Sequence, residues 1–155
     1  VLNNGEPMFR KVTIPAGYSV PLDYEPVTLN RFANGAQILG LHALEPLEPG
    51  ASWPVVLAWS PDAAGTSTQY QFSLRVMSGD TAYGQLDMPA LDGDLWPPGE
   101  LVVNLFEISV AADMPLDDVR LQLVMYSWPD MATMPVTDAD GNPIEPWLFL
   151  AARDE

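Results

Sequence analysis

The sequence predicts an all-β protein, an antiparallel β-sandwich of about eight to ten strands. The first observation behind this prediction is that apolar and polar residues alternate over runs of about eight residues, most clearly from Tyr70 to Val76. Successive side chains of a strand point to opposite faces, so such a run has one buried and one solvated face. The second observation is that clusters of Pro, Gly and Asp separate these runs, as the turns of a sandwich do. Immunoglobulin-like and jelly-roll-like topologies are both compatible with this spacing.

The N-terminal segment, residues 1–26, is expected to be a Pro-rich tether or an edge arm. It contains four prolines, which cannot donate ladder hydrogen bonds, and residues 11–14 are its one expected short strand. We expect the sandwich domain over residues 27–155. Its expected strands cover residues 27–32, 36–44, 53–60, 69–77, 82–88, 100–110, 119–127, 133–136 and 146–151.

Turn-forming residues bound these expected strands. Examples are Glu48-Pro49-Gly50, Pro97 to Glu100 and Asp138 to Asn142, in which Pro fixes φ and Gly or Asn accepts positive φ. One helical signal, residues 113–119, is interrupted by Pro115. Apolar residues of equal parity predict the inner faces of two packed sheets, namely Val55, Leu57, Trp59, Tyr70, Phe72, Leu74, Val76, Phe106, Ile108, Val110, Leu121, Leu123 and Met125.

The charge balance of this acidic chain excludes one class of partner. The chain has six basic and 21 acidic residues, which gives a net charge of −15. A field of this sign repels the phosphates of nucleic acids and anionic membrane surfaces, so we expect no nucleic-acid binding. The chain has no cysteine, hence no disulfide or thiolate metal site. No apolar run approaches the roughly 20 residues that span a bilayer, so we do not expect the chain itself to cross a membrane.

The order of motifs over residues 36–150 resembles a known family. The motifs are Gln37 to Leu41, Leu47 to Gly50, Val56 to Trp59, Tyr70 to Leu74, Trp96 to Glu100, Val119 to Tyr126 and Met134 to Gly141. They are similar to the all-β domain found near the C-termini of bacterial membrane glycosyltransferases of the dolichyl-phosphate-mannose mannosyltransferase type, and in related surface proteins. The resemblance implies a β-sandwich that serves as an extracytoplasmic accessory domain attached to a membrane protein.

Two segments depart from the pattern of that family. The family usually has Asp where this chain has Asn104, and it usually has Tyr-Pro-Thr where this chain has Leu91 to Asp94. The resemblance covers an appendage and includes no transferase motif, so it implies no catalytic residue.

Exposed tryptophans are the first candidate ligand site. Four of the five tryptophans adjoin a proline, at expected strand ends or in loops. Trp96 lies beside Asp92 and Asp94, and Trp128 lies beside Asp130. Sugar rings stack on aromatic faces while nearby carboxylates bond their hydroxyls, so these five residues form a candidate carbohydrate platform. The alternative is that the Trp-Pro pairs plug the open ends of the sandwich.

The loop from Asp138 to Asn142 is the candidate metal site. Asp138, Asp140 and Asn142 place oxygen ligands at i, i+2 and i+4, which suits Ca²⁺. An EF-hand is excluded because Pro143 occupies the sixth position and Phe149 the twelfth. The alternative to a calcium site is a tight hairpin turn in which Asp and Asn bond their own backbone.

Catalytic constellations find little support in the sequence. His42 is the only histidine and no Gly-x-Ser-x-Gly elbow is present, so we expect an exposed or strand-end histidine and no enzyme activity. Asp92, Asp94 and Glu100 could supply the two carboxylates of an acidic glycosidase, which is kept as a second alternative.

The function expected from the sequence is therefore a non-catalytic, extracytoplasmic accessory or interaction domain. Its expected partner is a glycan, bound weakly, or another protein domain. The first alternative is a structural subunit of a surface assembly, such as a filament, a surface layer or a capsid-like shell, in which the N-terminal arm binds the sheet edge of a neighbour.

Overall fold

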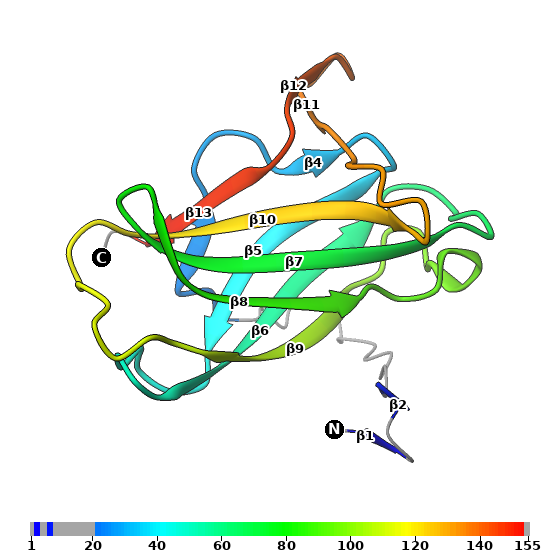
Figure 1. The fold of residues 1–155 in the computed structure, drawn as a ribbon. Helices are drawn as coiled ribbons and strands as arrows, with labels where there is room; N and C mark the ends of the chain where they lie inside the picture. Colours follow the sequence, from blue (N-terminus) through cyan, green and yellow to red (C-terminus); the bar gives the residue numbers. More distant parts are fainter. Residues whose placement is uncertain (1, 4–5, 8–20, 154–155) are drawn as a thin grey trace.

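The computed structural model describes residues 2–3, 6–7 and 21–153, and these residues form an all-β fold (Figure 1). Eleven strands belong to one antiparallel sheet that folds over on itself into two packed layers. A 3₁₀ turn, Gly93–Leu95, is the only helical segment in this described part of the chain. The predicted antiparallel β-sandwich is confirmed.

The strands of this sheet follow one another at short intervals along the chain. They are β3 (Tyr24–Pro26), β4 (Arg31–Phe32), β5 (Ala36–Ala43), β6 (Ser52–Pro61), β7 (Gln69–Ser78), β8 (Thr81–Pro89), β9 (Val102–Ser109), β10 (Val119–Trp128), β11 (Val136–Thr137), β12 (Pro143–Glu145) and β13 (Leu148–Ala152). Two further strands, β1 (Leu2–Asn3) and β2 (Glu6–Pro7), pair with each other.

The two layers are joined along one edge by a short strand. The layer β13-β10-β7-β8 lies at the front of Figure 1, and β5, β6 and β9 lie behind it. β3 pairs with β13 on one side and with β5 on the other, so the hydrogen bonding continues from one layer into the next.

The seven long strands begin and end within two residues of their predicted bounds. The strand predicted over residues 27–32 is not observed as such. β3 lies before this range, and only residues 31–32 of the range form a strand, β4. Residues 24–26, which we had assigned to the N-terminal arm, form β3 and so belong to the sandwich; residues 8–20 of the arm lie outside the described residues. Residues 113–118 form turns and loop in place of the weak helical signal.

The core lies between the layers and consists of the inward residues of the long strands. Phe72 and Leu74 are fully buried, as predicted. The Trp59 ring meets Phe72 edge-on at 5.5 Å between ring centroids and Trp96 at 5.2 Å. Aromatic pairs in this geometry add stability beyond the area they bury, so these three rings anchor one end of the core.

The second edge of the sandwich, between β8 and β9, is held by two isolated hydrogen bonds. The Ala111 amide donates to the Tyr83 carbonyl at 2.8 Å. The Asn104 Nδ2 donates to the Pro89 carbonyl at 3.1 Å, while its Oδ1 accepts from Trp59 Nε1 at 2.8 Å. Asn104 is buried, and its side chain links Trp59 of β6 to the end of β8 at this edge.

Candidate functional site

The predicted pairing of Trp96 with Trp128 in one platform is wrong, because Trp96 belongs to the core. Trp96 is 4% exposed, and its Nε1 donates to the Leu91 carbonyl at 2.8 Å. Its ring also packs on Tyr70, with 5.5 Å between centroids. The backbones at Gly65 and Gly93 pack so closely beside it that a Cβ on Gly65 would overlap the Gly93 carbonyl. Trp96 therefore plugs the end of the sandwich.

The carboxylates predicted beside the two tryptophans are all exposed. Asp92 directly precedes the 3₁₀ turn and Asp94 lies within it. Asp130 is exposed in the turn that follows β10. Trp128 is 51% exposed and is the last residue of β10, where it pairs with Gln69. The structure thus keeps Trp128 as a candidate contact and removes Trp96.

A different group of aromatic side chains lies around Trp128, on what we call the outer face. The outer face is the solvent side of the layer β13-β10-β7-β8. On β10, Leu121, Leu123 and Met125 point into the core, so the alternating residues Tyr126 and Trp128 point outward. On β13, Leu148 and Leu150 point inward and Phe149 outward, with Trp147 directly before the strand.

Trp147 and Phe149 could have been recognised from the sequence. The run from Leu148 to Leu150 alternates in the same way as Tyr70 to Val76, and the parity of Phe149 is the opposite of its two neighbours. Trp147 is one of the four tryptophans that adjoin a proline, and the sequence does not single it out as a platform residue. Trp147 is 37% exposed and so is available for contact.

A hydrogen-bonded group of polar side chains lies next to these aromatic residues. Tyr126 donates its hydroxyl to Asp87 Oδ2 at 2.9 Å. Gln85 Nε2 donates to Asp87 Oδ1 at 3.0 Å and to Ser73 Oγ at 3.2 Å. Because each side chain holds the next, the group is ordered before any ligand arrives.

These contacts shift the ionisation of both acidic partners. Burial opposes ionisation of the Asp87 carboxyl, but hydrogen bonds from Ser73, Gln85 and Tyr126 and the charge of Arg75 outweigh it and lower its pKa. Burial, the hydrogen bond to Asp87 and the charge of Asp87 together raise the pKa of Tyr126 to about 12. At neutral pH the pair is therefore a phenol donating to a carboxylate.

Two arginines complete the outer face and are held in place by it. Arg75 Nη1 donates to Gln122 Oε1 at 2.9 Å. The Arg120 guanidinium lies 4.9 Å from the centre of the Phe149 ring and donates from Nη2 to the Gly79 carbonyl at 3.0 Å. A cation over an aromatic ring is a favourable contact, so Arg120 and Phe149 fix each other.

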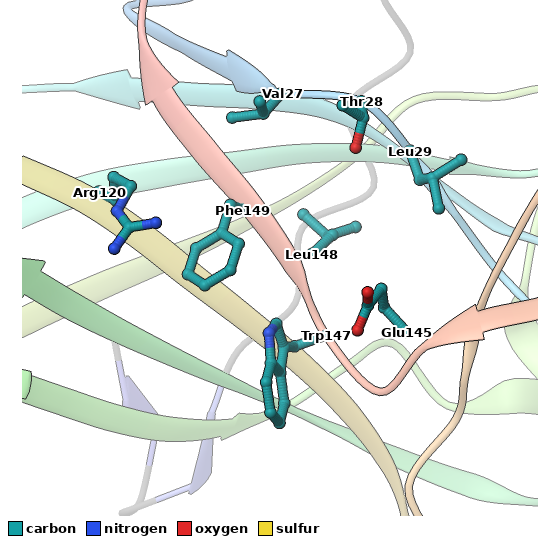
Figure 2. Close-up of a pocket in the computed structure, with 8 residues that line it drawn as sticks. All are labelled: Val27, Thr28, Leu29, Arg120, Glu145, Trp147, Leu148 and Phe149. Carbon is teal, nitrogen blue, oxygen red and sulfur yellow. The ribbon is translucent and has the colours of Figure 1, made fainter. Parts of the chain in front are cut away.

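A cavity opens at the margin of the outer face, where two segments of chain diverge; we call it the wedge cavity (Figure 2). The Val27 amide still donates to the Phe149 carbonyl of β13 at 2.9 Å. The segment after Val27 then diverges from β13 and continues into β4. The gap has a volume of about 240 Å³. Its lining residues are Val27, Thr28, Leu29, Arg120, Glu145, Trp147, Leu148 and Phe149.

The wedge cavity combines apolar walls with two uncommitted polar groups. Figure 2 shows the Thr28 hydroxyl and the Glu145 carboxylate directed toward each other from opposite sides of Leu148, with Trp147 and Phe149 on the far side of β13. Within the described part of the chain, neither side chain has a hydrogen bond or an ion pair of its own. Both polar groups are therefore available to a ligand.

The loop from Asp138 to Asn142 is organised as a turn. Asp138 Oδ1 accepts hydrogen bonds from the amides of Asp140 and Asn142, each at 2.9 Å, and its Oδ2 accepts from Asn142 Nδ2 at 3.2 Å. Hydrogen bonds from the backbone and the side chain of Asn142 make the largest contribution to lowering the pKa of Asp138, and those from the amides of Asp140 and Gly141 add to it. In residues 21–153 no three acidic or histidine side chains converge on one point. Calcium binding at this loop stays a prediction.

His42 is the partner of a carboxylate near the end of β5. Its Nδ1 lies 2.8 Å from Asp23 Oδ2, which also accepts the Ala43 amide at 2.8 Å. This clamp attaches the segment before β3 to β5 and lies apart from the residues of the outer face.

The sequence matches no protein-family model, and no curated protein is significantly similar to it. None of the described residues forms a helix long and apolar enough to cross a membrane. The function must therefore be inferred from the geometry of the site itself.

Proposed function

We propose that this chain is a non-catalytic, extracytoplasmic accessory domain that binds a carbohydrate on its outer face. The observation that carries the proposal is that two tryptophans are exposed beside ordered hydrogen-bonding side chains: Trp128 at the end of β10, and Trp147 directly before the neighbouring strand β13. The apolar face of a pyranose stacks on an aromatic ring while its hydroxyls bond carboxylates, amides and guanidinium groups. The outer face supplies both kinds of contact.

The rigidity of the outer face supports a binding role. The polar side chains at Tyr126, Asp87, Gln85 and Ser73 already bond one another. A ligand that meets an ordered surface loses less affinity to the cost of ordering side chains. Binding should still be modest, because a ligand on an open sheet keeps much of its surface in water.

The ionisation of Asp87 supports binding in preference to glycoside hydrolysis. A glycosidase needs one carboxylic acid that is protonated near neutral pH to protonate the leaving group. Asp87, the carboxylate at the centre of the polar group, has a lowered pKa and accepts hydrogen bonds. It can orient a hydroxyl and is poorly suited to donate a proton.

The cellular setting of the proposal follows from the resemblance of residues 36–150 to accessory domains of membrane glycosyltransferases. Such a domain lies outside the cytoplasm and is attached to a membrane protein. A glycan ligand suits that location, because it would hold the parent protein near its product or its acceptor.

The test is a titration of the protein on an array of neutral and uronate-bearing oligosaccharides, followed by tryptophan fluorescence with the glycans that bind. Trp128→Ala and Trp147→Ala should each weaken binding about tenfold, since aromatic residues dominate such contacts. The control is Leu95→Ala, which removes another exposed apolar side chain, from the 3₁₀ turn. Absence of any bound glycan, or equal affinity of all variants, would contradict the proposal.

A further inference from the structure

We infer that the wedge cavity receives one neutral hexopyranose unit, the end of an oligosaccharide whose remaining units lie along the outer face. This inference rests on the proposed function and adds to it both a selectivity and a direction for the ligand.

The size of the cavity limits its occupant to one ring. Its volume of about 240 Å³ lies below the roughly 300–1,000 Å³ of pockets that enclose drug-sized ligands. Val27, Leu29 and Leu148 supply apolar walls, and Trp147 lines the cavity from the far side of β13 (Figure 2). A pyranose ring has an apolar face of its own to place against such walls.

The polar groups of the cavity suit hydroxyls. An ionised carboxylate has two acceptor oxygens and can accept from two neighbouring hydroxyls at once, and a Thr hydroxyl both donates and accepts. Glu145 and Thr28 present these groups from opposite sides of the cavity. A ring bound between them would have hydroxyls bonded on both edges.

The charges around the cavity exclude an acidic sugar. Glu145 lines the cavity, and the whole chain carries a net charge of −15, so a carboxylate, sulfate or phosphate on the ligand would be repelled. Arg120 does not compensate, because its Nη2 donates to the Gly79 carbonyl, its guanidinium lies within 4.0 Å of Asp80 and Asp118, and its flat side covers Phe149.

The position of the cavity relative to Trp128 requires a ligand of several units. Leu148 pairs with Leu123 of the antiparallel strand β10, so the register places Trp147 level with Val124, four residues before Trp128. At about 3.4 Å per residue this spacing is about 14 Å, which exceeds a single sugar ring. One oligosaccharide that contacts both tryptophans therefore runs along β10 and ends in the wedge cavity.

The experiment compares Glu145→Ala, Glu145→Gln and Thr28→Val with the wild type by isothermal titration calorimetry. The probes are the neutral oligosaccharides that bind on the array, in lengths from one to six hexose units, and uronate-bearing oligomers of the same lengths. The control variant is Glu107→Ala, which removes the same charge from an exposed position on β9, in the other layer.

We expect Glu145→Ala to weaken binding of the neutral oligomers about tenfold, since hydrogen bonds to a charged group are among the stronger ones. Glu145→Gln should weaken it less, and Glu107→Ala should leave it unchanged. Trp128→Ala should affect the long oligomers and spare the monosaccharide, whereas Trp147→Ala should affect both.

Each possible failure has a distinct meaning. Unchanged binding in Glu145→Ala and Thr28→Val, with losses in the two Trp variants, overturns the wedge-cavity inference and leaves the proposed function standing. Preference of the wild type for uronate-bearing oligomers overturns the selectivity and with it the inference. If no glycan binds to the wild type, both proposals fall together.

Discussion

At the scale of single residues, the outer face is held together by ionisation states as much as by shape. Tyr126 and Asp87 form a phenol–carboxylate pair in which each partner fixes the charge of the other. The pKa of Tyr126 is raised to about 12, from a value of 10.0 in an unfolded chain. The stabilisation that this shift represents is fully present below pH 10 and is lost as the pH rises through the folded value.

We therefore expect Tyr126→Phe to change how stability depends on alkaline pH. The wild type should lose stability between about pH 10 and pH 12 as the Tyr126 proton is lost, and the variant, which has no such proton, should lose less over that interval. Urea denaturation at a series of pH values measures the difference, and the ultraviolet absorbance of tyrosinate follows the titration. If the free energies of unfolding of the two proteins fall in parallel over this interval, the Tyr126–Asp87 pair does not cause the loss of stability at alkaline pH.

Trp96 and Trp128 provide the clearest contrast between residues of similar sequence context. Each precedes a proline and lies near aspartates, yet Trp96 is buried and Trp128 is exposed. We expect Trp96→Ala to lower the free energy of unfolding by about 3–5 kcal/mol, because it leaves a cavity beside Trp59 and Tyr70.

The matched variant Trp128→Ala should change the free energy of unfolding by no more than about 0.5 kcal/mol, as is usual for surface positions. Chemical denaturation followed by circular dichroism measures both. Equal losses for the two variants would mean that Trp128 has a structural role that its exposure does not indicate.

The contrast also shows where prediction of the site from sequence stops. The outward parity of Trp128 and Phe149 follows from alternation within β10 and β13, so half of the outer face could be predicted. The burial of Trp96 depends on a backbone contact between Gly65 and Gly93, which are 28 positions apart in the sequence. No local pattern encodes such a contact.

At the scale of strands, what could be predicted depends on length. β5 to β10 and β13 have five or more residues, and their alternation is visible in the sequence. β3, β4, β11 and β12 have two or three residues each, which is too short for a period to be read. Their existence depends on the partner strands, which only the three-dimensional arrangement supplies.

The edge between β8 and β9 gives a prediction at this scale. The two strands are not paired by a ladder of backbone hydrogen bonds, and the Asn104 side chain bonds the Pro89 carbonyl of β8 there. Asn104→Asp keeps an acceptor for Trp59 Nε1 but removes the donor to the Pro89 carbonyl, and it buries a carboxylate. We expect the free energy of unfolding at neutral pH to fall by about 1–3 kcal/mol.

The pH dependence of this variant separates charge from shape. Burial raises the pKa of the introduced carboxyl, so its unfavourable effect should be largest at neutral pH and should diminish as the pH falls and the protonated group donates again. Asn104→Leu, which has no ionisable group, should show no such recovery. A constant deficit in Asn104→Asp from pH 7 to pH 4 would argue against the proposed role of the Nδ2 donor.

At the scale of the whole molecule, the net charge of −15 affects every measurement with cations. Divalent ions can stabilise an acidic protein by screening self-repulsion, without any defined site. In the turn at Asp138, the carboxylate already accepts three hydrogen bonds from its own loop. A specific Ca²⁺ ion would have to displace at least part of that arrangement.

We expect millimolar Ca²⁺ to raise the melting temperature of the wild type and of an Asp138→Ala, Asp140→Ala double variant by the same amount. Thermal denaturation with Ca²⁺, and with NaCl at equal ionic strength, measures both shifts. A shift confined to the wild type and absent with NaCl would instead establish a calcium site, because specific binding stabilises the native state by mass action.

The pairing of Tyr24 with Ala152 brings two distant parts of the chain together at one corner of the sandwich. β3 and β13, the first and last strands of the 11-stranded sheet, lie side by side there, and the Arg153 amide donates to the Asp23 carbonyl at 2.8 Å. This corner lies near the start of β10, while Trp128 is at the far end of that strand. A ligand at Trp128 would therefore contact the sandwich at the end remote from this corner.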